Sequence, residues 1–298
     1  MIMEIVFLGT ASMFPTKDRN PSAVFISYGS EGILVDCGEG TQRQMKITEI
    51  RLTKITRILI SHWHGDHVYG LPGLLQSLDA SEYNKTLQIY GPKGTKKYFE
   101  ILGKGFVFKR SMDIEIKEVS EGKFFENEDF LLEALPLEHD IETLGFNFIE
   151  KNKRKIDMKK VKKFGMGEGP LLGRLKEGKI IEWEGKKITP EDVTYMKKGR
   201  KITIIDDTLI CNNCYRLAQD ADLLICEATY SSQLEEKSKE YQHMTAKQAA
   251  QIANKAHVKK LILTHFSARY KNIQEIEEDA RGIFDNIICA EDFMKIYI

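Results

Sequence analysis

Three histidines and one aspartate lie together in one short segment of this 298-residue chain: His62, His64, Asp66 and His67. Neutral imidazole and carboxylate are the ligands that zinc takes in hydrolytic sites. On a tight loop, the first two can point one way and the last two another, so one segment can serve two adjacent ions. The segment therefore predicts a catalytic centre with two zinc ions, and a metal-dependent hydrolase.

Further candidate ligands stand at the ends of predicted strands. His139 and His265 each follow an apolar run, and Asp207 follows the run 202–205. A single histidine at a strand end is more often an ordinary hydrogen-bonded side chain, so the set as a whole, and no one residue, predicts the ligands. His257 lies at a basic helix terminus, and we expect it to be solvated.

Short β-branched runs separated by turn signals indicate the elements that position these residues. The predicted strands are residues 4–8, 23–27, 32–36, 55–60, 87–90, 129–134, 144–149, 202–205, 222–226 and 260–263. Apolar spacing predicts helices over 70–80 and 245–256. Both halves mix strands and helices, which favours two sheets covered by helices, with the histidine cluster on a loop between a strand and a helix.

The strand pattern breaks between about residues 150 and 200, where Lys, Glu and Gly are abundant and we expect little apolar burial. Residues 151–163 carry eight Lys or Arg against the single acid Asp157, although the chain's net charge is zero. Such a run is either a solvated surface or a local site for a polyanion. An insertion of this length in a compact enzyme is usually functional.

Composition fits a globular protein, with 30% charged and 42% hydrophobic residues. The apolar runs are too short to span a bilayer, and the start lacks the features of a signal peptide, so we expect a cytoplasmic protein. Five cysteines, an odd number, suit free thiols in a reducing compartment. Cys211 and Cys214 have zinc-knuckle spacing, but no second pair exists, which favours a structural or incidental role.

The segment His62–His67 resembles the His-x-His-x-Asp-His motif of the metallo-β-lactamase superfamily. Other segments resemble one branch of it, the ribonuclease Z family of tRNA 3′-processing endonucleases: Phe7–Ser12, Asp36–Gln44, Cys226–Tyr230, His243–Thr245 and Leu263–Tyr270. This resemblance spans essentially the whole chain. It implies an α/β fold, the αββα four-layer sandwich, as a single domain over 1–298 with a protruding tRNA-binding arm inserted at 150–200.

The resemblance also implies the roles of individual residues. His62, His64 and His139 would hold the first zinc, and Asp66, His67 and His265 the second, while Asp207 would bridge both. The family usually has Gly-Asp-Thr where this chain has Asp206-Asp207-Thr208, so Asp206 is an unexpected charge. We expect Asp207 to bridge the ions and Asp206 not to do so. Manganese, iron or cobalt could replace zinc in such a site.

Three residues are candidates for further catalytic roles. Asp66 could orient the nucleophile or take its proton, and His243 is a candidate general acid because imidazole titrates near neutrality. Glu227 either orients His243 or is a structural carboxylate at a strand end. Hydrolysis would leave a 3′-hydroxyl on the tRNA and a 5′-phosphate on the released trailer.

The remaining predicted contacts are with tRNA. The loop 15–20 matches a family loop associated with the tRNA 3′ end, and 165–178 resembles the family's arm. The candidate substrate-binding residues are Pro15, Lys17, Arg19, Asn20, Lys159, Lys160, Lys162, Lys163, Gly169, Pro170 and Arg174. Lys and Arg contacts to phosphate supply much of the affinity for nucleic acid. The resemblance also suggests a homodimer in which each arm serves the partner's active site.

Three other functions remain open from the sequence alone. A second type of hydrolase from the same superfamily, such as a small-molecule phosphodiesterase, sulfatase or thioesterase, would share the metals but need no basic arm. An RNA-binding protein that had lost catalysis would not need the full ligand set. Zinc storage or structural zinc binding is disfavoured, because a structural site is normally closed by four protein ligands.

Overall fold

The ten predicted strands and four further ones, at residues 114–118, 122–126, 287–289 and 295–297, assemble into two seven-stranded sheets in the structure, a computed structural model that describes residues 2–107 and 111–298. In order across the first sheet, the strands are β18 (Lys295–Tyr297), β1 (Met3–Gly9), β2 (Ala23–Tyr28), β3 (Glu31–Val35), β4 (Arg57–Leu59), β5 (Leu87–Gly91) and β6 (Ile114–Glu118). The strands from β3 to β6 run parallel. Their carboxyl ends therefore lie along one edge of the sheet.

The second sheet is built mostly from the second half of the chain. Its order is β17 (Ile287–Cys289), β16 (Leu261–Thr264), β15 (Leu223–Glu227), β14 (Lys201–Ile205), β9 (Thr143–Glu150), β8 (Phe130–Leu137) and β7 (Gly122–Glu126). The strands from β14 to β17 are parallel. Aromatic side chains join the two sheets face to face, with the rings of Tyr28 and Phe148 centred 5.4 Å apart and those of Tyr90 and Phe124 4.9 Å apart.

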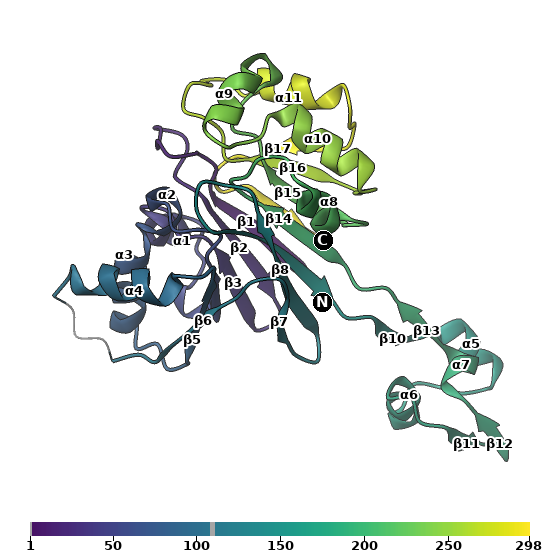
Figure 1. The fold of residues 1–298 in the computed structure, drawn as a ribbon. Coiled ribbons are helices and arrows are strands. Elements are labelled where there is room, and N and C mark those ends of the chain that lie inside the picture. Colours follow the sequence, from purple (N-terminus) through teal and green to yellow (C-terminus); the bar gives the residue numbers. More distant parts are fainter. Residues whose placement is uncertain (1, 108–110) are drawn as a thin grey trace. The chain divides into compact units, whose positions relative to one another are not determined.

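Helices cover the outer face of each sheet, as Figure 1 shows. Beside the first sheet are α1 (Thr41–Ile47), the 3₁₀ turn η1 (Leu52–Lys54), α2 (Gly65–Val68), α3 (Leu71–Ala80) and α4 (Thr95–Lys104). Beside the second are α8 (Asn212–Ala218), η2 (Ser232–Leu234), α9 (Glu235–Glu240), α10 (Ala246–Lys255) and α11 (Gln274–Arg281). Each sheet shares an apolar core with its helices. This arrangement confirms the predicted αββα sandwich.

Both predicted helices form for reasons visible in the sequence. In α3, leucines at helical spacing are all buried: Leu71, Leu74, Leu75 and Leu78. At the start of α10, the hydroxyl of Thr245 accepts the backbone N–H of Gln248, and the Gln248 side chain accepts the N–H of Thr245. This capping box fixes where α10 begins, directly after His243 and Met244.

A second compact unit comprises residues 126–131 and 149–200. It contains β10 (Lys153–Ile156) paired with β13 (Thr194–Lys197), the hairpin of β11 (Ile181–Trp183) and β12 (Lys186–Ile188), and the helices α5 (Met158–Lys163), α6 (Pro170–Lys176) and α7 (Pro190–Val193). The expectation of little apolar burial here is wrong. Six residues form a core of their own: Val161, Met166, Leu175, Ile181, Ile188 and Val193.

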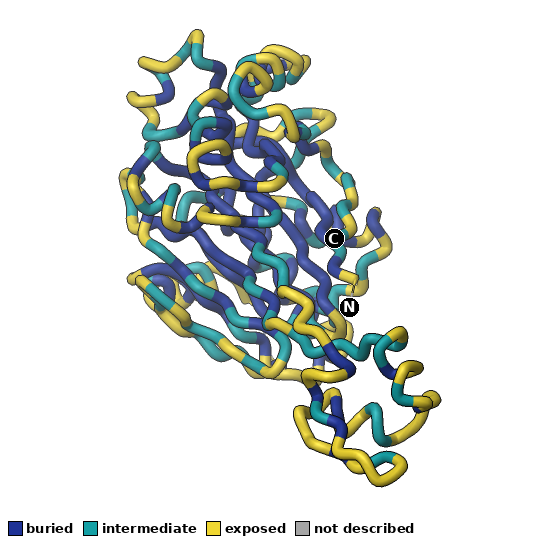
Figure 2. Tube along the Cα trace, turned by 90° about the vertical axis from the view of Figure 1, so that its right-hand side faces the viewer, coloured by how far each residue is buried: buried dark blue, intermediate teal, exposed yellow. Residues whose placement is uncertain are grey.

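The burial pattern differs between the two units. Figure 2 shows long buried stretches along the strands of the sandwich, whereas most residues of the second unit are exposed or half-buried. Among the described residues, no helix has both the length and the apolar character needed to cross a membrane.

Candidate metal centre

The ligand candidates meet because they follow the ends of strands in both sheets. His62 lies three residues after β4, Asp207 two residues after β14, and His265 directly after β16. In open α/β sheets, bound molecules and ions lie at the carboxyl ends of the parallel strands. His265 adopts a φ of +60°, a conformation uncommon for a non-glycine residue, and its carbonyl accepts the hydroxyl of Thr229 at 3.0 Å. The fold thus holds this histidine in a specific turn at the sheet edge.

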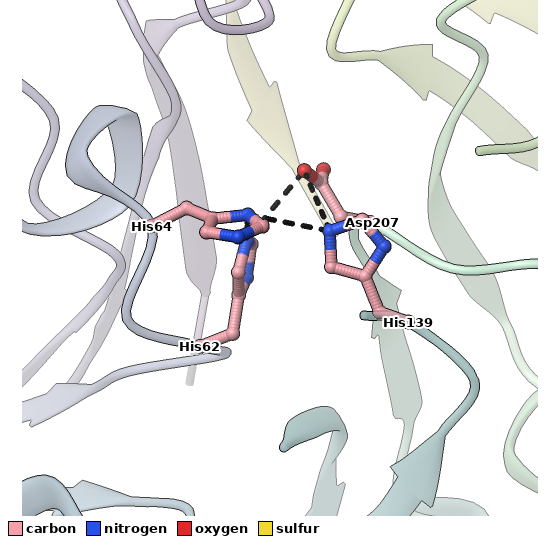
Figure 3. A group of neighbouring side chains, drawn as sticks. All are labelled: His62, His64, His139 and Asp207. Carbon is pink, nitrogen blue, oxygen red and sulfur yellow. Dashed lines mark hydrogen bonds and ion pairs between the residues drawn. The ribbon is translucent and has the colours of Figure 1, made fainter. Parts of the chain in front are cut away.

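The first group of ligand atoms combines three imidazoles with one carboxylate: His62, His64, His139 and Asp207. Their candidate ligand atoms all lie within 4.8 Å of one another, and Figure 3 shows the side chains turned toward one another. Nδ1 of His64 lies 3.1 Å from Nε2 of His62 and 3.3 Å from Nε2 of His139. Three imidazoles and an acid arranged around one point are a set that suits zinc.

The second group shares Asp207 with the first and adds three further side chains: Asp66, His67 and His265. Nε2 of His67 lies 3.4 Å from the carboxylate of Asp66 and 3.5 Å from that of Asp207. Nε2 of His265 lies 3.0 Å from Oδ1 of Asp207. These three atoms, Nε2 of His67, Nε2 of His265 and Oδ1 of Asp207, are buried and make no hydrogen bond within the described chain. Such orphaned atoms fit a bound divalent cation.

Four of the five candidate ligand histidines have their other ring nitrogen held by a neighbour through Nδ1, whereas the fifth, His64, has its Nε2 3.3 Å from Asp140. Nδ1 of His67 donates to Asp36 at 2.8 Å, and Nδ1 of His139 donates to the carbonyl of Gln242 at 3.0 Å. Hydroxyl groups lie beside the remaining two rings, at 2.9 Å from Nδ1 in each case: Ser61 beside His62 and Thr229 beside His265. These contacts turn Nε2 of each of the four rings toward the centre, as metal sites require.

Asp36 is a functional candidate that sequence reasoning missed. It is buried after β3, and its carboxylate accepts the N–H and the hydroxyl of Ser61, each at 2.7 Å, besides Nδ1 of His67. One carboxylate thus fixes both ends of the histidine segment. Its place at the end of the predicted strand 32–36, where the family-like segment Asp36–Gln44 begins, is the signal that the sequence offers.

The electrostatics of the centre keep its acids ionised. Although burial opposes ionisation of Asp207, the neighbouring His265, His243 and His67 hold the pKa of this carboxyl well below its usual range. Burial likewise opposes charge on Asp66, but His67 and His265 lower the pKa of that carboxyl. Burial and the adjacent imidazole of His67 lower the pKa of His62, which favours the neutral form that binds metal.

The carboxylates of the adjacent residues Asp206 and Asp207 have different neighbours. Asp207 belongs to both ligand groups described above, whereas Asp206 belongs to neither. Asp206 accepts the hydroxyl of Ser22 at 3.0 Å and lies 4.0 Å from Nδ1 of His67, behind that ring and near Asp36. Burial raises the pKa of Asp206 to about 7. The chain therefore separates the two carboxylates by the His67 ring.

His243 lies beside the ligands, next to a fixed carboxylate. Its Nδ1 is 3.2 Å from Oε1 of Glu227 and 3.9 Å from Asp207. Glu227 is fully buried and accepts the N–H of Thr208 and the hydroxyl of Thr229, both at 2.7 Å. Burial opposes protonation of His243, but the charges of Glu227 and Asp207 raise its pKa above the ordinary value.

A cavity of about 250 Å³ opens onto this centre. Its walls include ligand side chains, His243 and the segment 240–243, together with Ser12 and Met13. Met13 and the neighbouring Phe14 are exposed apolar residues. The cavity thus gives a substrate access to both ligand groups and to His243 at once.

The predicted substrate-binding residues fall into two places. Pro15, Lys17, Arg19 and Asn20 lie in the sandwich, whereas the other candidates lie in the second unit. Arg19 donates to the carbonyl of Tyr270 and lies over the Phe266 ring, and Asn20 donates to the carbonyl of Glu39. Pro15 and Lys17 are exposed. His257 is exposed and outside the centre.

Comparison with known proteins gives matches over the whole chain. Ribonuclease Z of Methanothermobacter thermautotrophicus is 39% identical over 298 residues, covering 100% of this chain and 97% of that protein. The crystal structure of the short form of human tRNase Z superposes with a TM-score of 0.72 at 29% identity, covering 98% of each chain. A metallo-β-lactamase fold protein of Bacillus subtilis, YhfI, has a TM-score of 0.73 at 16% identity, covering 100% and 99%, and supports the fold alone.

A family model described as Anti-Pycsar protein Apyc1 matches residues 3–151. This first half of the chain shares the pattern of that family and includes the cluster 62–67 and His139. The match ends before Asp207, His243 and His265, which the full-length relative covers. On the strength of that full-length match, this chain belongs to the ribonuclease Z family of tRNA-processing endonucleases and has their metallo-β-lactamase fold.

Proposed function

We propose that this chain is a zinc-dependent endoribonuclease that removes the 3′ trailer from precursor tRNA, leaving a tRNA 3′-hydroxyl and a trailer 5′-phosphate. The observation that carries the proposal is Asp207, whose carboxylate faces two groups of ligand atoms in a chain of the ribonuclease Z family. The first ion would be held by His62, His64 and His139, the second by Asp66, His67 and His265, and Asp207 would hold both. When bound, two such ions lower the pKa of an attacking water and neutralise charge on the phosphate.

The side chains around the cavity would then orient the attacking water and transfer the protons. Asp66 lines the cavity and is placed to orient the attacking water and take its proton. His243 lines the same cavity and would protonate the leaving 3′ oxygen. Glu227, with no exposed surface, would position His243 through the contact at Nδ1. Its two hydrogen bonds from Thr208 and Thr229 favour this positioning role over a purely structural one.

The deciding experiment uses the purified protein and a 3′-extended precursor tRNA. We expect one cut at the 3′ end of the tRNA body, with a 3′-hydroxyl and a 5′-phosphate on the products by end mapping. A chelator should abolish cleavage, and add-back of zinc, manganese, iron or cobalt, one at a time, should show which ions support it. Cleavage of a simple phosphodiester without action on precursor tRNA would contradict the proposal and favour a small-molecule hydrolase.

We propose that the loop 15–20 contacts the tRNA 3′ end through its exposed residues. Lys17 is the cation available for RNA, because its only salt bridge in the described chain is a 3.7 Å contact with exposed Asp18. Arg19 and Asn20 would act by holding the loop in place, since both side chains contact the sandwich. Of the predicted tRNA-binding residues in this loop, Lys17 would therefore contact the RNA, while Arg19 and Asn20 would support the loop.

We propose that the second unit grips the tRNA body. Four lysines of α5 carry the positive charge: Lys159, Lys160, Lys162 and Lys163. None of them makes a salt bridge within the described chain, whereas nearby Lys151 and Arg154 are paired with acids. Arg174, Gly169 and Pro170 are exposed at α6 and would add to the same surface. Unpaired lysines are well suited to phosphate contacts.

Replacing these four lysines with glutamine should raise KM for precursor tRNA by about tenfold and leave kcat nearly unchanged, because α5 contributes no side chain to the candidate ligand groups or to the cavity beside them. The salt dependence of binding should also weaken, by a slope of about 1 for each lysine that contacts phosphate. A matched control replaces four exposed lysines of the sandwich: Lys93, Lys96, Lys97 and Lys104. Equal effects in the two variants would contradict a specific role for α5.

The resemblance to the ribonuclease Z family also leads us to propose a homodimer in the cytoplasm, where each arm serves the partner's active site. Sedimentation at several protein concentrations tests the assembly. Mixing a variant lacking the four α5 lysines with a His243→Ala variant tests the exchange of arms at precursor tRNA concentrations below KM, where the first variant is slow and the second nearly inactive. Mixed dimers would then regain one complete site. Failure of any mixture to regain activity would contradict arm exchange.

A further inference from the structure

Two cysteine thiols lie next to each other at the start of α8. Sγ of Cys211 and Sγ of Cys214 are 3.5 Å apart, and all five cysteines of the chain are free. A disulfide requires about 2.05 Å between the sulfurs, so the two need to approach by only roughly 1.5 Å. Neither cysteine joins a group of potential metal ligands among residues 2–107 and 111–298. This spacing therefore points away from a zinc knuckle and toward thiol chemistry.

The two thiols are unequal in access and acidity. Cys211 is the N-cap residue of α8 and is 9% exposed, whereas Cys214 has no exposed surface. The adjacent Cys214 side chain and the backbone N–H groups of Cys214 and Asn213 lower the pKa of the Cys211 thiol, although burial opposes this shift. Burial and the neighbouring sulfur raise the pKa of Cys214. Such an asymmetry makes one cysteine the nucleophile and the other its resolving partner.

We propose that Cys211 and Cys214 are a redox pair that a peroxide oxidises to an intramolecular disulfide. The Cys211 sulfur attacks one peroxide oxygen, the O–O bond breaks, and with hydrogen peroxide one water leaves. The Cys214 sulfur then attacks the oxidised Cys211 sulfur and displaces the second water. The two thiols lose two electrons in total and the peroxide gains them. A small oxidant suits a thiol with so little exposed surface. An added dithiol reduces the disulfide back to two thiols by exchange and is itself oxidised to a disulfide.

The disulfide would act on the metal centre through the segment 208–211. Both cysteines belong to the apolar core beside the second sheet. Cys214 lies inside α8 with no exposed surface, whereas Cys211 precedes the helix as its N-cap, so the approach falls mainly to Cys211. The segment is hydrogen-bonded to the centre: Thr208 donates to Glu227 at 2.7 Å, and Leu209 donates to the carbonyl of Glu138, the residue before His139. This effect on activity rests on the proposed function, whereas the disulfide does not. A displacement of about 1 Å at a catalytic group can cost up to about a hundredfold in rate.

The first test maps the oxidised bonds in the full-length, zinc-loaded protein. After titration with hydrogen peroxide and digestion without reductant, we expect one linkage between Cys211 and Cys214, lost on treatment with dithiothreitol. Cys289 is the matched control, because it is 7% exposed but lies alone, and burial raises its pKa to about 12. Free thiols at both positions, or irreversible oxidation of Cys211 without linkage, would overturn the proposal.

The second test measures turnover of precursor tRNA before and after oxidation. Wild type should lose about tenfold in kcat on oxidation and regain it with dithiothreitol, and Cys289→Ala should behave in the same way. Cys211→Ala should keep its activity through the same treatment. An equal loss in Cys211→Ala, or full activity of the linked wild type, would overturn the coupling to the centre. Inactivity of the fully reduced wild type would instead count against the proposed function, and the mapped disulfide would be unaffected.

Discussion

Asp207→Asn is expected to lose both zinc ions and at least about a hundredfold of turnover on precursor tRNA. Asp207 is the one residue common to the two main ligand groups, and its Oδ1 is a buried oxygen without a hydrogen-bond partner in the described chain. An amide of the same shape removes the negative charge that faces five neighbouring imidazoles, those of His62, His67, His139, His243 and His265. Elemental analysis of the purified variant measures the metal, and a precursor tRNA assay measures the loss.

Asp206→Asn is the matched control for this prediction. It makes the same chemical change one residue earlier, at a carboxyl that accepts from Ser22 and stands behind the His67 ring. We expect this variant to retain both zinc ions and to lose less than about tenfold in turnover. Two bound zinc ions in Asp207→Asn, with loss of zinc in Asp206→Asn, would reverse the two roles. Thermal unfolding of both variants separates loss of metal from loss of fold.

The strands and the metal-ligand candidates were the parts of this protein most accessible from sequence. Strands such as β14 and β16 are short apolar runs followed within two residues by a polar ligand candidate, Asp207 or His265. Because the carboxyl ends of parallel strands share an edge, the fold itself brings these candidates together. The choice between Asp206 and Asp207 depended on the family resemblance. Side chains alternate between the two faces of a sheet only within a strand, so this alternation does not show which of two residues beyond the strand end points toward the site.

Features that depend on contacts between distant residues could not be predicted in this way. Asp36 stands at the end of a predicted strand, but the local sequence does not show that it accepts a hydrogen bond from the candidate ligand His67, 31 positions away. The core of the second unit was not predicted, because it too forms from residues that are far apart in the sequence. Its elements are short, and each contributes one or two apolar residues, such as Ile181 from β11 and Ile188 from β12. No window of the sequence there shows a sustained period.

The loop 15–20 shows the same limit at the level of single residues. A basic turn predicts that its Lys and Arg side chains all face the nucleic acid. In the folded chain, however, one of these side chains contacts the protein itself. Arg19 stacks over Phe266 and donates to the carbonyl of Tyr270, which leaves Lys17 exposed. Which cation a turn exposes is decided by the segment 266–270, far away in the sequence. A motif match assigns all the residues of such a loop to substrate binding. The tertiary contacts show which of them are exposed and which support the loop.

His243→Ala is expected to retain both zinc ions and to lose roughly 10²- to 10⁴-fold in kcat on precursor tRNA. His243 belongs to neither ligand group that shares Asp207, so both metal sites keep their full sets of side chains. Its Nδ1 is occupied by Glu227, which leaves Nε2 as the nitrogen that can give a proton to the leaving 3′ oxygen. KM should change little, because the lost interaction belongs to the transition state.

Two further variants make the interpretation specific. His257→Ala removes an exposed histidine outside the centre and should have wild-type turnover. Glu227→Gln keeps a side chain of the same shape but removes the charge that favours the protonated ring, so kcat should fall by about tenfold while zinc is retained. Unchanged turnover in His243→Ala would remove this residue from the mechanism. Loss of one zinc ion from that variant would assign His243 to a metal shell instead, since it also groups with Glu227 and His265.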